Sequence, residues 1–442
     1  MSSIMNINRD GSSKRTVLVF SVLFMGLAHI LLFRQYIKGA FFALVQITVL
    51  AFLPAIATAM RGLVTLGEAN PLVPVMYRDH SLFMLIDGVA VLAALALALC
   101  VYVISVRSAS KTYRDFCISG RLKKNLESVK ESFQGAFTIF SLAPSVLLVV
   151  FFVVVPLVFA ALVAFTNYSH PFHIPPASTI DWVGLDNFRT LFVGGTQWTP
   201  ALARVAIWTL VWAFSATVTC YFGGMLMAVI MKDFKVRFAP FFRVIFILPY
   251  AVPAVISMLV WRNLLNGNFG AINRTLMHFG IIDGIIPWLT SEWLVRFTVV
   301  LVNLWAGFPY FMLLTMGSMT AISDDLFDAA KIDGANKFML FRKITFPLVV
   351  FQTMPLIIMS FTHNINNFGA IFFLTGRHPP ALDTPITNAA SVDILITWIY
   401  QLTMNSMQYH FASVLAVMIF VILAPFAIFQ LRRTKAFKDG EL

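Results

Sequence analysis

The sequence predicts an all-α polytopic membrane protein with about eight transmembrane helices, because it is strongly apolar and its apolar residues fall in long runs. Of its 442 residues, 59% are hydrophobic and 12% are charged, and the mean hydropathy is +0.83. A soluble domain is nearer half apolar and a quarter charged. About 20 apolar residues cross the roughly 30 Å of hydrocarbon in a bilayer. Apolar runs lie at 17–33, 40–60, 82–106, 137–166, 204–231, 242–263, 296–322, 347–373 and 410–430.

The placement of the basic residues predicts the orientation of these runs. The net charge is +12. Most of the Lys and Arg lie in the loops 107–136, 232–241 and 323–346 and in the tail after 430. Cytosolic loops of membrane proteins carry such an excess of positive charge. We therefore assign these segments to the cytosol and take the charge as a sign of orientation, not of a nucleic-acid partner.

The first apolar run, 17–33, is expected not to cross the membrane. Nine crossings from a cytosolic N-terminus would place the strongly basic loop 107–136 outside. Either the N-terminus is external, or one early run does not cross. The run 17–33 is the shortest and has basic residues on both sides, which favours an interfacial or re-entrant segment. Eight crossings and two cytosolic termini remain, and no cleavable signal is evident.

The patterns of catalytic, metal and cofactor sites are missing from the sequence. Cys100, Cys117 and Cys220 have no metal-ligand spacing and suggest no disulfide framework. The histidines are scattered without H-E-x-x-H, and no G-x-x-x-x-G-K-[ST] phosphate loop is present. Asp87 could act as a proton-relay acid, but a lone acid there is better explained as paired or near a helix end. We expect neither an enzyme nor a metal or cofactor site, and any ATPase must be another chain.

The polar segment 323–346 has the signals of a folded loop. Ser323 and the acids after it can cap a helix start, where acids also meet the positive end of the helix dipole. Small alanines then favour helix, Gly334 permits a turn, and Pro347 suits a first helical turn. These signals predict a compact helix-turn-helix at the membrane surface. The alternative is a capped loop that meets no partner.

Residues 328–347 resemble the EAA loop of importer permeases that are driven by ATP-binding cassettes. The resemblance implies two short helices that dock into a cleft of the ATPase. Asp328 stands where Glu is usual and Phe346 where Leu is usual. The positions that the resemblance assigns to ATPase coupling are Asp328, Ala329, Ala330, Asp333, Gly334, Ala335, Ile344 and Pro347.

A wider resemblance, over roughly residues 137–442, is to the larger permease subunit of maltose/maltodextrin importers (MalF-type). It implies a type I ABC importer permease fold, with a variable N-terminal membrane region at 1–136 and the permease core at 137–442. Some members carry a folded domain in the external loop after FTNYS. Here that loop is only 167–203, so the extra contact of such a domain with the sugar-binding protein should be absent. The segments that carry the resemblance are FTNYS at 165–169, WVGLDNF at 182–188, ILPYAVPAVIS at 247–257, NLWAGFPYFM at 303–312 and NINNF at 364–368.

Polar and aromatic residues inside the spans predict a substrate path. Ser360, Asn364 and Asn367 have the spacing i, i+4 and i+7, so we expect them on one helix face. The segment 303–310 repeats that spacing, and Tyr250 lies where flanking prolines should distort a helix. Sugar hydroxyls need polar partners in a membrane. The alternative is that these side chains only join helices, as polar residues in spans often do.

The resemblance assigns these segments to the sugar pocket near the middle of the membrane. Ala254 stands where the family has a serine, so one hydrogen bond to the sugar is absent. The residues assigned to substrate binding by the spacing and the resemblance are Tyr250, Asn303, Ala306, Gly307, Tyr310, Phe311, Ser360, Asn364 and Asn367.

The resemblance implies a channel-forming subunit of an ATP-driven maltose or maltodextrin importer in the bacterial inner membrane. Its partners would be a second permease subunit (MalG-type), two ATPase subunits (MalK-type), an external sugar-binding protein and membrane lipid, but no nucleic acid. One rival is an importer of another oligosaccharide, a sugar alcohol or a glycerophosphodiester. A phosphorylated ligand should demand a buried Arg or Lys in these segments, and none is present. A second rival is an ion-coupled secondary transporter, which would have no use for a docking loop.

Overall fold

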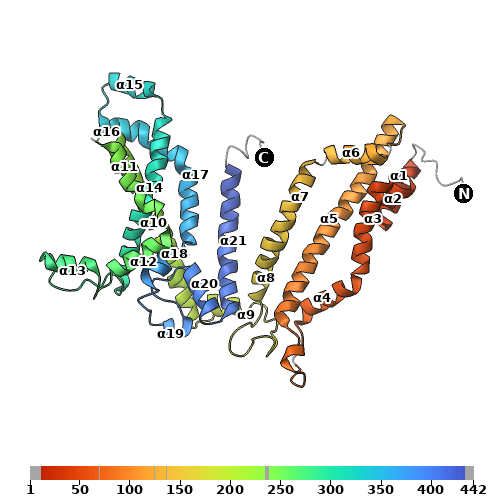
Figure 1. Cartoon of the computed structure of the whole chain (residues 1–442), viewed down its shortest axis with the longest axis horizontal. Coiled ribbons are helices and arrows are strands. Elements are labelled where there is room, and N and C mark those ends of the chain that lie inside the picture. The colour runs from red at the N-terminus through yellow and green to blue at the C-terminus, as the bar shows by residue number, and fades with distance from the viewer. Residues whose placement is uncertain (1–10, 69, 124, 136, 234–237, 434–442) are drawn as a thin grey trace. The chain divides into compact units, whose positions relative to one another are not determined.

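The computed structural model describes residues 11–68, 70–123, 125–135, 137–233 and 238–433. Over these residues the chain is helical, and extended pairing amounts to a few isolated bridges. The prediction of an all-α protein is therefore confirmed. Backbone contacts divide the chain into unit 1, ending at Trp182, and unit 2, beginning at Val183. Unit 1 is coloured red to yellow in Figure 1, and unit 2 runs from yellow-green to blue.

Unit 1 is built around one long helix, α5, against which α1, α3, α4 and α8 pack. With 39 residues, α5 is about 58 Å long, far more than the roughly 30 Å hydrocarbon layer. The elements of the unit are α1 (Gly11–Leu23), α2 (Leu27–Leu31), α3 (Tyr36–Ala51), α4 (Leu53–Thr65), η1 (Val75–Tyr77), α5 (Ser81–Ser119), α6 (Asn125–Gly135), α7 (Phe137–Val149), the π-helical turn η2 (Val150–Val154) and α8 (Val155–Val163).

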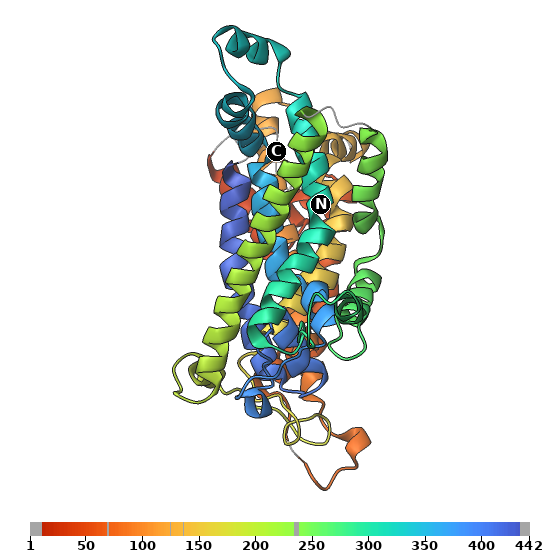
Figure 2. The same ribbon diagram turned by 90° about the vertical axis from the view of Figure 1, so that its left-hand side faces the viewer.

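Unit 2 is organised around the pair α10 and α14, which α17 joins. Figures 1 and 2 show α15 and α16 at one end of these helices and α9, α19 and α20 at the other. The elements are α9 (Asp186–Phe192), α10 (Trp198–Asp233), α11 (Ala239–Ala251), α12 (Ala254–Leu264), α13 (Ala271–His278), α14 (Glu292–Thr320), α15 (Asp324–Ile332), α16 (Lys337–Leu340), the π-helical turn η3 (Phe341–Thr345), α17 (Phe346–Ile365), α18 (Phe368–Thr375), α19 (Thr384–Thr387), α20 (Leu395–Met404) and α21 (Tyr409–Arg433).

Six helices in the described ranges are long and apolar enough to cross a membrane, or eight if each of two bent pairs is one span. The higher number matches the expected eight. The bent pairs are α3 with α4, at 56°, and α11 with α12, at 93°. The run 17–33 forms the two short helices α1 and α2, separated at Gly26, and neither has the length of a span.

Two helices begin before the apolar runs that predicted them. The span expected to begin at 347 begins at Lys337, because α16, η3 and α17 form one helical rod. Its basic residues are long enough to reach water from a helix end, so charge did not mark a loop there. Helix α10 likewise begins at Trp198, inside the segment 167–203 that was assigned to the external loop.

The sharp break between α11 and α12 follows from two prolines. Val252 is extended, with φ −86° and ψ 135°, as the residue before a proline prefers. Pro249 and Pro253 also lack an N–H, so the carbonyl groups four residues earlier have no helical donor. The distortion that was expected around Tyr250 is therefore confirmed as a change of helix direction.

Helices α10 and α14 approach closely because glycine stands at their contact. A Cβ atom added to Gly224 would lie 2.6 Å from the Cβ of Phe311, 2.6 Å from the amide nitrogen of Met312 and 2.7 Å from the carbonyl oxygen of Phe308. Real Cβ atoms essentially never come so close. Small residues allow backbones to meet in this way in membrane helices, where dispersion contacts replace the hydrophobic effect.

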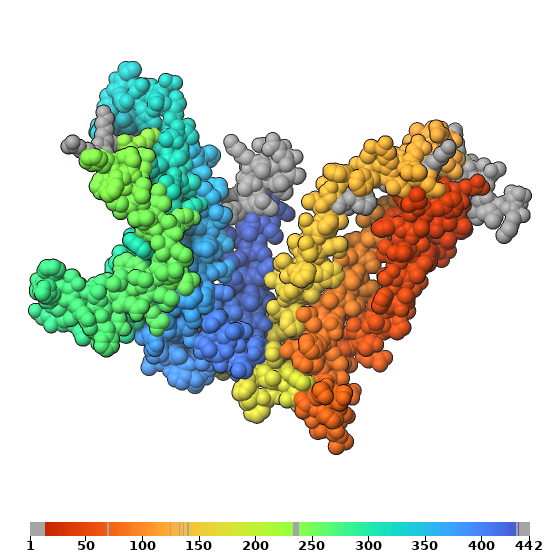
Figure 3. Space-filling view, in the orientation of Figure 1, coloured from red at the N-terminus to blue at the C-terminus, as the bar shows by residue number. Residues whose placement is uncertain are grey.

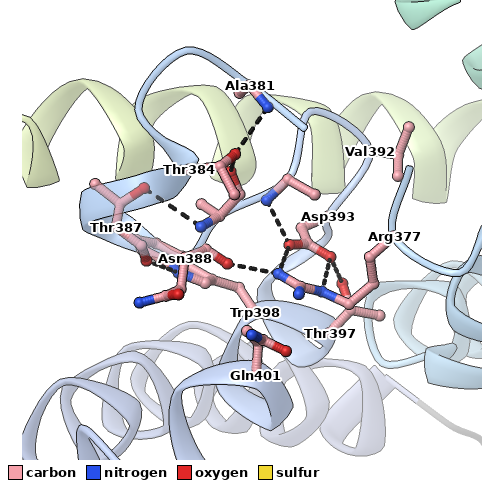
Figure 4. A network of polar contacts seen from close by, with 12 residues as sticks. Arg377, Ala381, Thr384, Thr387, Asn388, Val392, Asp393, Thr397, Trp398 and Gln401 are labelled. Carbon is pink, nitrogen blue, oxygen red and sulfur yellow. Dashed lines mark hydrogen bonds and ion pairs between the residues drawn. The ribbon is translucent and has the colours of Figure 1, made fainter. Parts of the chain in front are cut away.

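Two ion pairs fix the loop between α18 and α20, and Figure 4 shows the more deeply buried one. Arg377 binds Asp393 through its Nη2, at 2.6 Å from Oδ2, and through Nε, at 3.1 Å from Oδ1. Asp393 is fully buried and also accepts from the amide of Ala390 and the hydroxyl of Thr397. Arg204 of α10 pairs with Asp383 of the same loop at 2.7 Å. The loop is thereby tied to the helices that surround it.

The glycine contact makes a testable prediction. Gly224→Val should lower the free energy of unfolding by roughly 1–3 kcal/mol or prevent assembly of unit 2, because the added atoms overlap backbone that cannot move aside. The measurement is thermal unfolding of the purified chain in detergent. Gly317→Val is the matched control, since Gly317 lies on α14 with open space around its Cα. Equal unfolding temperatures for the two variants would contradict the close contact.

Candidate functional site

A cavity of about 770 Å³ lies in unit 2 between α10, the α11–α12 break, α14, α17 and the start of α18. Its size is that of sites for small molecules. All nine residues that the sequence analysis assigned to substrate binding line it. The structure therefore brings together side chains from three separate segments of the chain. Their role in binding stays a prediction.

The prediction that Ser360, Asn364 and Asn367 share one helix face is wrong for Asn367. Helix α17 ends at Ile365, and Asn367 instead caps α18, where its Oδ1 accepts from the amide of Ala370 at 3.3 Å. Asparagine suits such a cap because its side-chain oxygen replaces a missing backbone acceptor. Asn367 still reaches the cavity, but from a helix break.

The cavity is thus bordered by two helix breaks, one at Val252–Pro253 and one at Asn366–Asn367. Within a membrane, irregular backbone is tolerated only where protein buries it or where it borders a water-filled space. Residues of both breaks, Val252, Pro253 and Asn367, line this one space. This arrangement favours a hydrated cavity that accepts a polar ligand.

Two of the predicted polar residues already have partners on other helices. The side-chain Nδ2 of Asn364 donates to the Oγ1 of Thr217 on α10 at 3.0 Å, and the backbone carbonyl oxygen of Asn364 accepts from the indole of Trp212 at 3.1 Å. The Nδ2 of Asn303 contacts the Sγ of Cys220 at 3.4 Å. Both asparagines are largely buried. Asn364 joins α17 to α10, and Asn303 joins α14 to α10. Both asparagines therefore make the contacts between helices that were the alternative to substrate binding. Each also lines the cavity.

The three aromatic residues of the predicted site also differ in burial. Tyr250 and Tyr310 stack with their ring centres 6.2 Å apart, and 58% of the surface of Tyr250 is exposed. Phe311 is only 2% exposed and meets Tyr221 edge to face. Both tyrosines line the cavity, whereas Phe311 touches it from within the buried core.

Three polar side chains on the wall are not committed elsewhere in the described part of the chain. The Ser360 hydroxyl and the His363 ring make no hydrogen bond there, and the buried Oγ of Ser257 lacks a partner. His363 and Ser257 were not among the predicted residues. The spacing of three residues from Ser360 to His363 on α17 could have found the histidine.

The cavity wall carries no Asp, Glu, Lys or Arg. Burying a charge without a partner is costly, so a wall of this kind disfavours a charged ligand. Amide, hydroxyl and imidazole groups are all able to exchange hydrogen bonds with neutral hydroxyl groups. The cavity is therefore suited to a neutral polyhydroxylated ligand.

The predicted loop at 323–346 folds around Gly334. The Ser323 hydroxyl accepts from the amide of Asp325 and begins α15. Gly334 has φ +84°, and the amides of Gly334 and Ala335 bond back to the carbonyls of Lys331 and Ala330 at 3.0 and 2.9 Å. These two bonds are those of the Schellman turn that ends many helices. The predicted capped helix and glycine turn are both present, but the second helix is the start of the rod that contains α17.

The surface of this loop is open. Asp328, Ala329, Asp333 and Gly334 are exposed, and Figure 3 shows the loop projecting beyond the helices of unit 2. Ile344 instead packs against the core formed by α10, α14 and α17. Four apolar side chains of the loop are also exposed: Leu326, Ile332, Phe338 and Met339.

Comparison with known proteins identifies the family. Residues 220–434 match the family model described as binding-protein-dependent transport system inner membrane component. The galactooligosaccharides transport system permease protein GanP of Bacillus subtilis is 36% identical over 92% of this chain and 94% of its own length. The maltodextrin transport system permease protein MalC of Streptococcus pneumoniae is 32% identical over 91% and 92%. The maltose/maltodextrin permease MalF of Klebsiella aerogenes is 35% identical, over 59% of this chain and 51% of that protein.

Solved structures agree with the fold. A bacterial ABC transporter that imports the acidic polysaccharide alginate has a chain of 20% identity that superimposes with a TM-score of 0.53, over 70% of this chain and all of that one. An alginate transporter in complex with its pentasaccharide-bound periplasmic protein gives 0.55, at 19% identity over 69% and 96%. At such identity the likeness supports the fold alone, and it confirms the expected ABC importer permease fold. With extensive identity to curated permeases over nearly its whole length, the chain belongs to the family of binding-protein-dependent transport system inner membrane components.

Proposed function

We propose that this chain is a transmembrane permease subunit of an ATP-driven, binding-protein-dependent importer of neutral oligosaccharides. The observation that carries the proposal is the cavity in unit 2, which has uncommitted polar groups, a pair of stacked tyrosines and no charged residue on its wall. Membership of the family supplies the class of transporter, and the chemistry of the wall supplies the class of ligand.

Maltose and maltodextrins are the substrates that we favour. The resemblance in the segments around Tyr250, Asn303 and Asn364 points to them, and relatives named for maltodextrin transport match most of the chain. Sugar rings have apolar faces that pack on aromatic rings and hydroxyl groups that need polar partners. The Tyr250–Tyr310 pair and the polar groups of α17 supply both kinds of contact to one ligand.

Galactooligosaccharides are a second candidate. The relative named for their transport is 36% identical over 92% of the chain. Ala254 lines the cavity at the place where the maltose-type family has serine, and the loss of one hydroxyl changes which sugar hydroxyl can be bound. An acidic sugar such as the alginate of the structural neighbours would meet no Lys or Arg on this wall.

The transport cycle that we propose is alternating access. Two ATPase subunits would bind the coupling loops, one loop from this chain and one from a second permease subunit in the bacterial inner membrane. Closure of the ATPases moves the loops together and opens the cavity outward, where an external binding protein releases the sugar into it. Hydrolysis then restores the inward-facing state. An ion-coupled mechanism is disfavoured, because the cavity has no carboxylate to bind a coupling ion.

The direct test is to purify the chain from its native membrane with its partners. We expect an ATPase, a second permease and a binding protein to accompany it. ATP turnover by the complex should rise with maltose or maltodextrins and not with alginate oligosaccharides. Stimulation by galactooligosaccharides alone would select the second candidate. Accumulation of sugar by the isolated chain on an ion gradient, without an ATPase, would refute the proposed class.

The cavity wall gives a second prediction. Ser360→Val should raise the KM for sugar uptake about 2- to 10-fold, the value of one net hydrogen bond, while thermal stability stays unchanged. The adjacent control is Thr362→Val, because the Thr362 hydroxyl bonds the carbonyl of Ile358 in its own helix and lies outside the cavity. Asn364→Leu should lower both uptake and unfolding temperature, since it also breaks the bond to Thr217. A KM for Ser360→Val equal to that of the control would exclude Ser360 from the site.

The coupling loop gives a third prediction. Gly334→Val should lower sugar uptake and sugar-stimulated ATP turnover while the protein still inserts. A β-branched residue resists φ +84°, at a cost of roughly 1–2 kcal/mol, although its side chain would meet no other atom. Gly284→Val is the matched control, with open space and an ordinary φ. Normal uptake in Gly334→Val would count against the loop as the docking element.

A further inference from the structure

Helix α17 ends beside the cavity with a carbonyl group that has lost its helical donor. In a continuous helix the carbonyl oxygen of Asn364 would accept from the amide of Phe368, four residues later. Here the amide of Phe368 instead bonds the carbonyl oxygen of Asn366 at 2.8 Å, because the chain has left the helix after Ile365. Asn364 is buried, and a buried backbone carbonyl without a donor costs free energy. The helix break therefore depends on what replaces this donor.

The replacement comes from α10, 152 residues away in the sequence. The indole Nε1 of Trp212 donates to the carbonyl oxygen of Asn364 at 3.1 Å, and the amide of Asn367 adds a longer contact at 3.3 Å. The side chain of Trp212 is fully buried and lies outside the cavity lining. A buried indole N–H usually finds a hydrogen-bond partner. In this chain it finds that partner at the helix break.

Helix α10 holds Asn364 at a second point. The Oγ1 of Thr217 accepts from the side-chain Nδ2 of Asn364 at 3.0 Å. The Oδ1 of Asn364 in turn accepts from the Nδ2 of Asn367 at 3.4 Å, and the Oδ1 of Asn367 accepts from the amide of Ala370 on α18. A chain of hydrogen bonds thus runs from α10 through both asparagines to α18. Asn364, Asn367 and Ala370 all line the cavity.

Trp208 makes the same kind of bond one helical turn earlier, but away from the cavity. Its Nε1 donates to the carbonyl oxygen of Val392 at 3.0 Å, in the loop before α20. Trp208 is also buried, and it belongs to the same core cluster as Trp212. The two indoles share a helix, a buried setting and a type of bond, and they differ in what they hold. Of the two, Trp212 holds a residue of the cavity wall.

We propose that Trp212 is a positioning residue for the sugar that binds in the cavity, an inference that rests on the proposed function. Its indole fixes the last turn of α17, which carries His363 to the cavity wall. Through Asn364 it also sets the position of Asn367 at the helix break. Trp212 itself does not touch the ligand. Its contribution is a wall that is already ordered before the sugar arrives, which lowers the entropic cost of binding.

The first arm of the test needs no sugar. Trp212→Phe keeps an aromatic ring in the core and removes the N–H donor, and Trp208→Phe is the matched control. The full chain, purified with the subunits that accompany it, is followed by hydrogen–deuterium exchange of its backbone amides. We expect faster exchange over 364–370 in Trp212→Phe and over 388–395 in Trp208→Phe. Unchanged exchange over 364–370 in Trp212→Phe would overturn the proposal, because the indole would then not hold the break.

The second arm measures sugar binding by the same purified proteins. Maltose and, separately, a galactooligosaccharide are titrated and followed by calorimetry. We expect Trp212→Phe to raise the Kd about 2- to 10-fold, the value of one net hydrogen bond. Trp208→Phe should bind with the wild-type Kd, although it also loses a buried hydrogen bond and should unfold at a similarly lowered temperature. A loss of stability alone therefore does not account for the expected difference.

The outcomes separate this inference from the proposed function. Equal Kd values for the two variants, or faster exchange in Trp212→Phe without weaker binding, would make Trp212 a structural contact and overturn its positioning role. Binding of neither sugar by the wild-type protein would refute the proposed class of ligand, and the role of Trp212 in binding it as well. The exchange data would in that case still decide whether the indole holds the helix break.

Discussion

The pairing of backbone amide and carbonyl groups inside the membrane is the constraint on which unit 2 depends. A continuous helix satisfies these groups internally, and any interruption must be compensated by protein or by water. The chain interrupts two helices, at Val252–Pro253 and at Asn366–Asn367, and both interruptions border one cavity. The breaks therefore do two things at once. They leave room between the helices, and they bring Tyr250 and Asn367 to the edge of that room, where the ligand that we propose would bind.

The remaining walls are held in place by contacts that leave little freedom. Gly224 allows α10 to touch α14, and the bond from Asn364 to Thr217 ties α10 to α17. The same helices present Tyr310, Ser360 and His363 to the cavity. Whether a polar residue in a span joins helices or serves a ligand is thus decided by its partners. Asn364 is occupied, whereas Ser360 and His363 are available. The surrounding hydrogen bonds make the wall rigid, and a rigid wall lowers the entropic cost of binding.

Local signals in the sequence predicted much of this structure, and the failures have physical causes. The apolar runs predicted the spans. Ser323 and Gly334 predicted the helix and turn of the loop at 323–346, because a cap and a turn depend only on residues close in the sequence. The prolines around Tyr250 announced the first break. The second helix break, at Asn366–Asn367, had no such signal. The segment NINNF contains neither Gly nor Pro, and its polar residues continue the helical spacing. The contact at Gly224 could not be predicted either, because it depends on a segment far along the chain. The basic residues before Pro347 suggested a loop, but they lie on helix. Long basic side chains are able to reach water from the end of a helix.

Continuous helix from Lys337 to Ile365 connects the exposed loop at 323–346 to the cavity wall. The rod carries the loop at one end and Ser360 and His363 near the other, about 35 Å apart at 1.5 Å per residue. If the loop docks as we propose, this rod is the connection through which a displacement of α16 would reach the cavity wall. The π-helical turn at Phe341–Thr345 is the one place between them where the helical hydrogen bonds change register, and such turns are frequent at functional sites. Ile344 in this turn packs on the core of α10, α14 and α17. In the coupling role that we propose, this contact would act as a pivot between the exposed loop and the cavity wall.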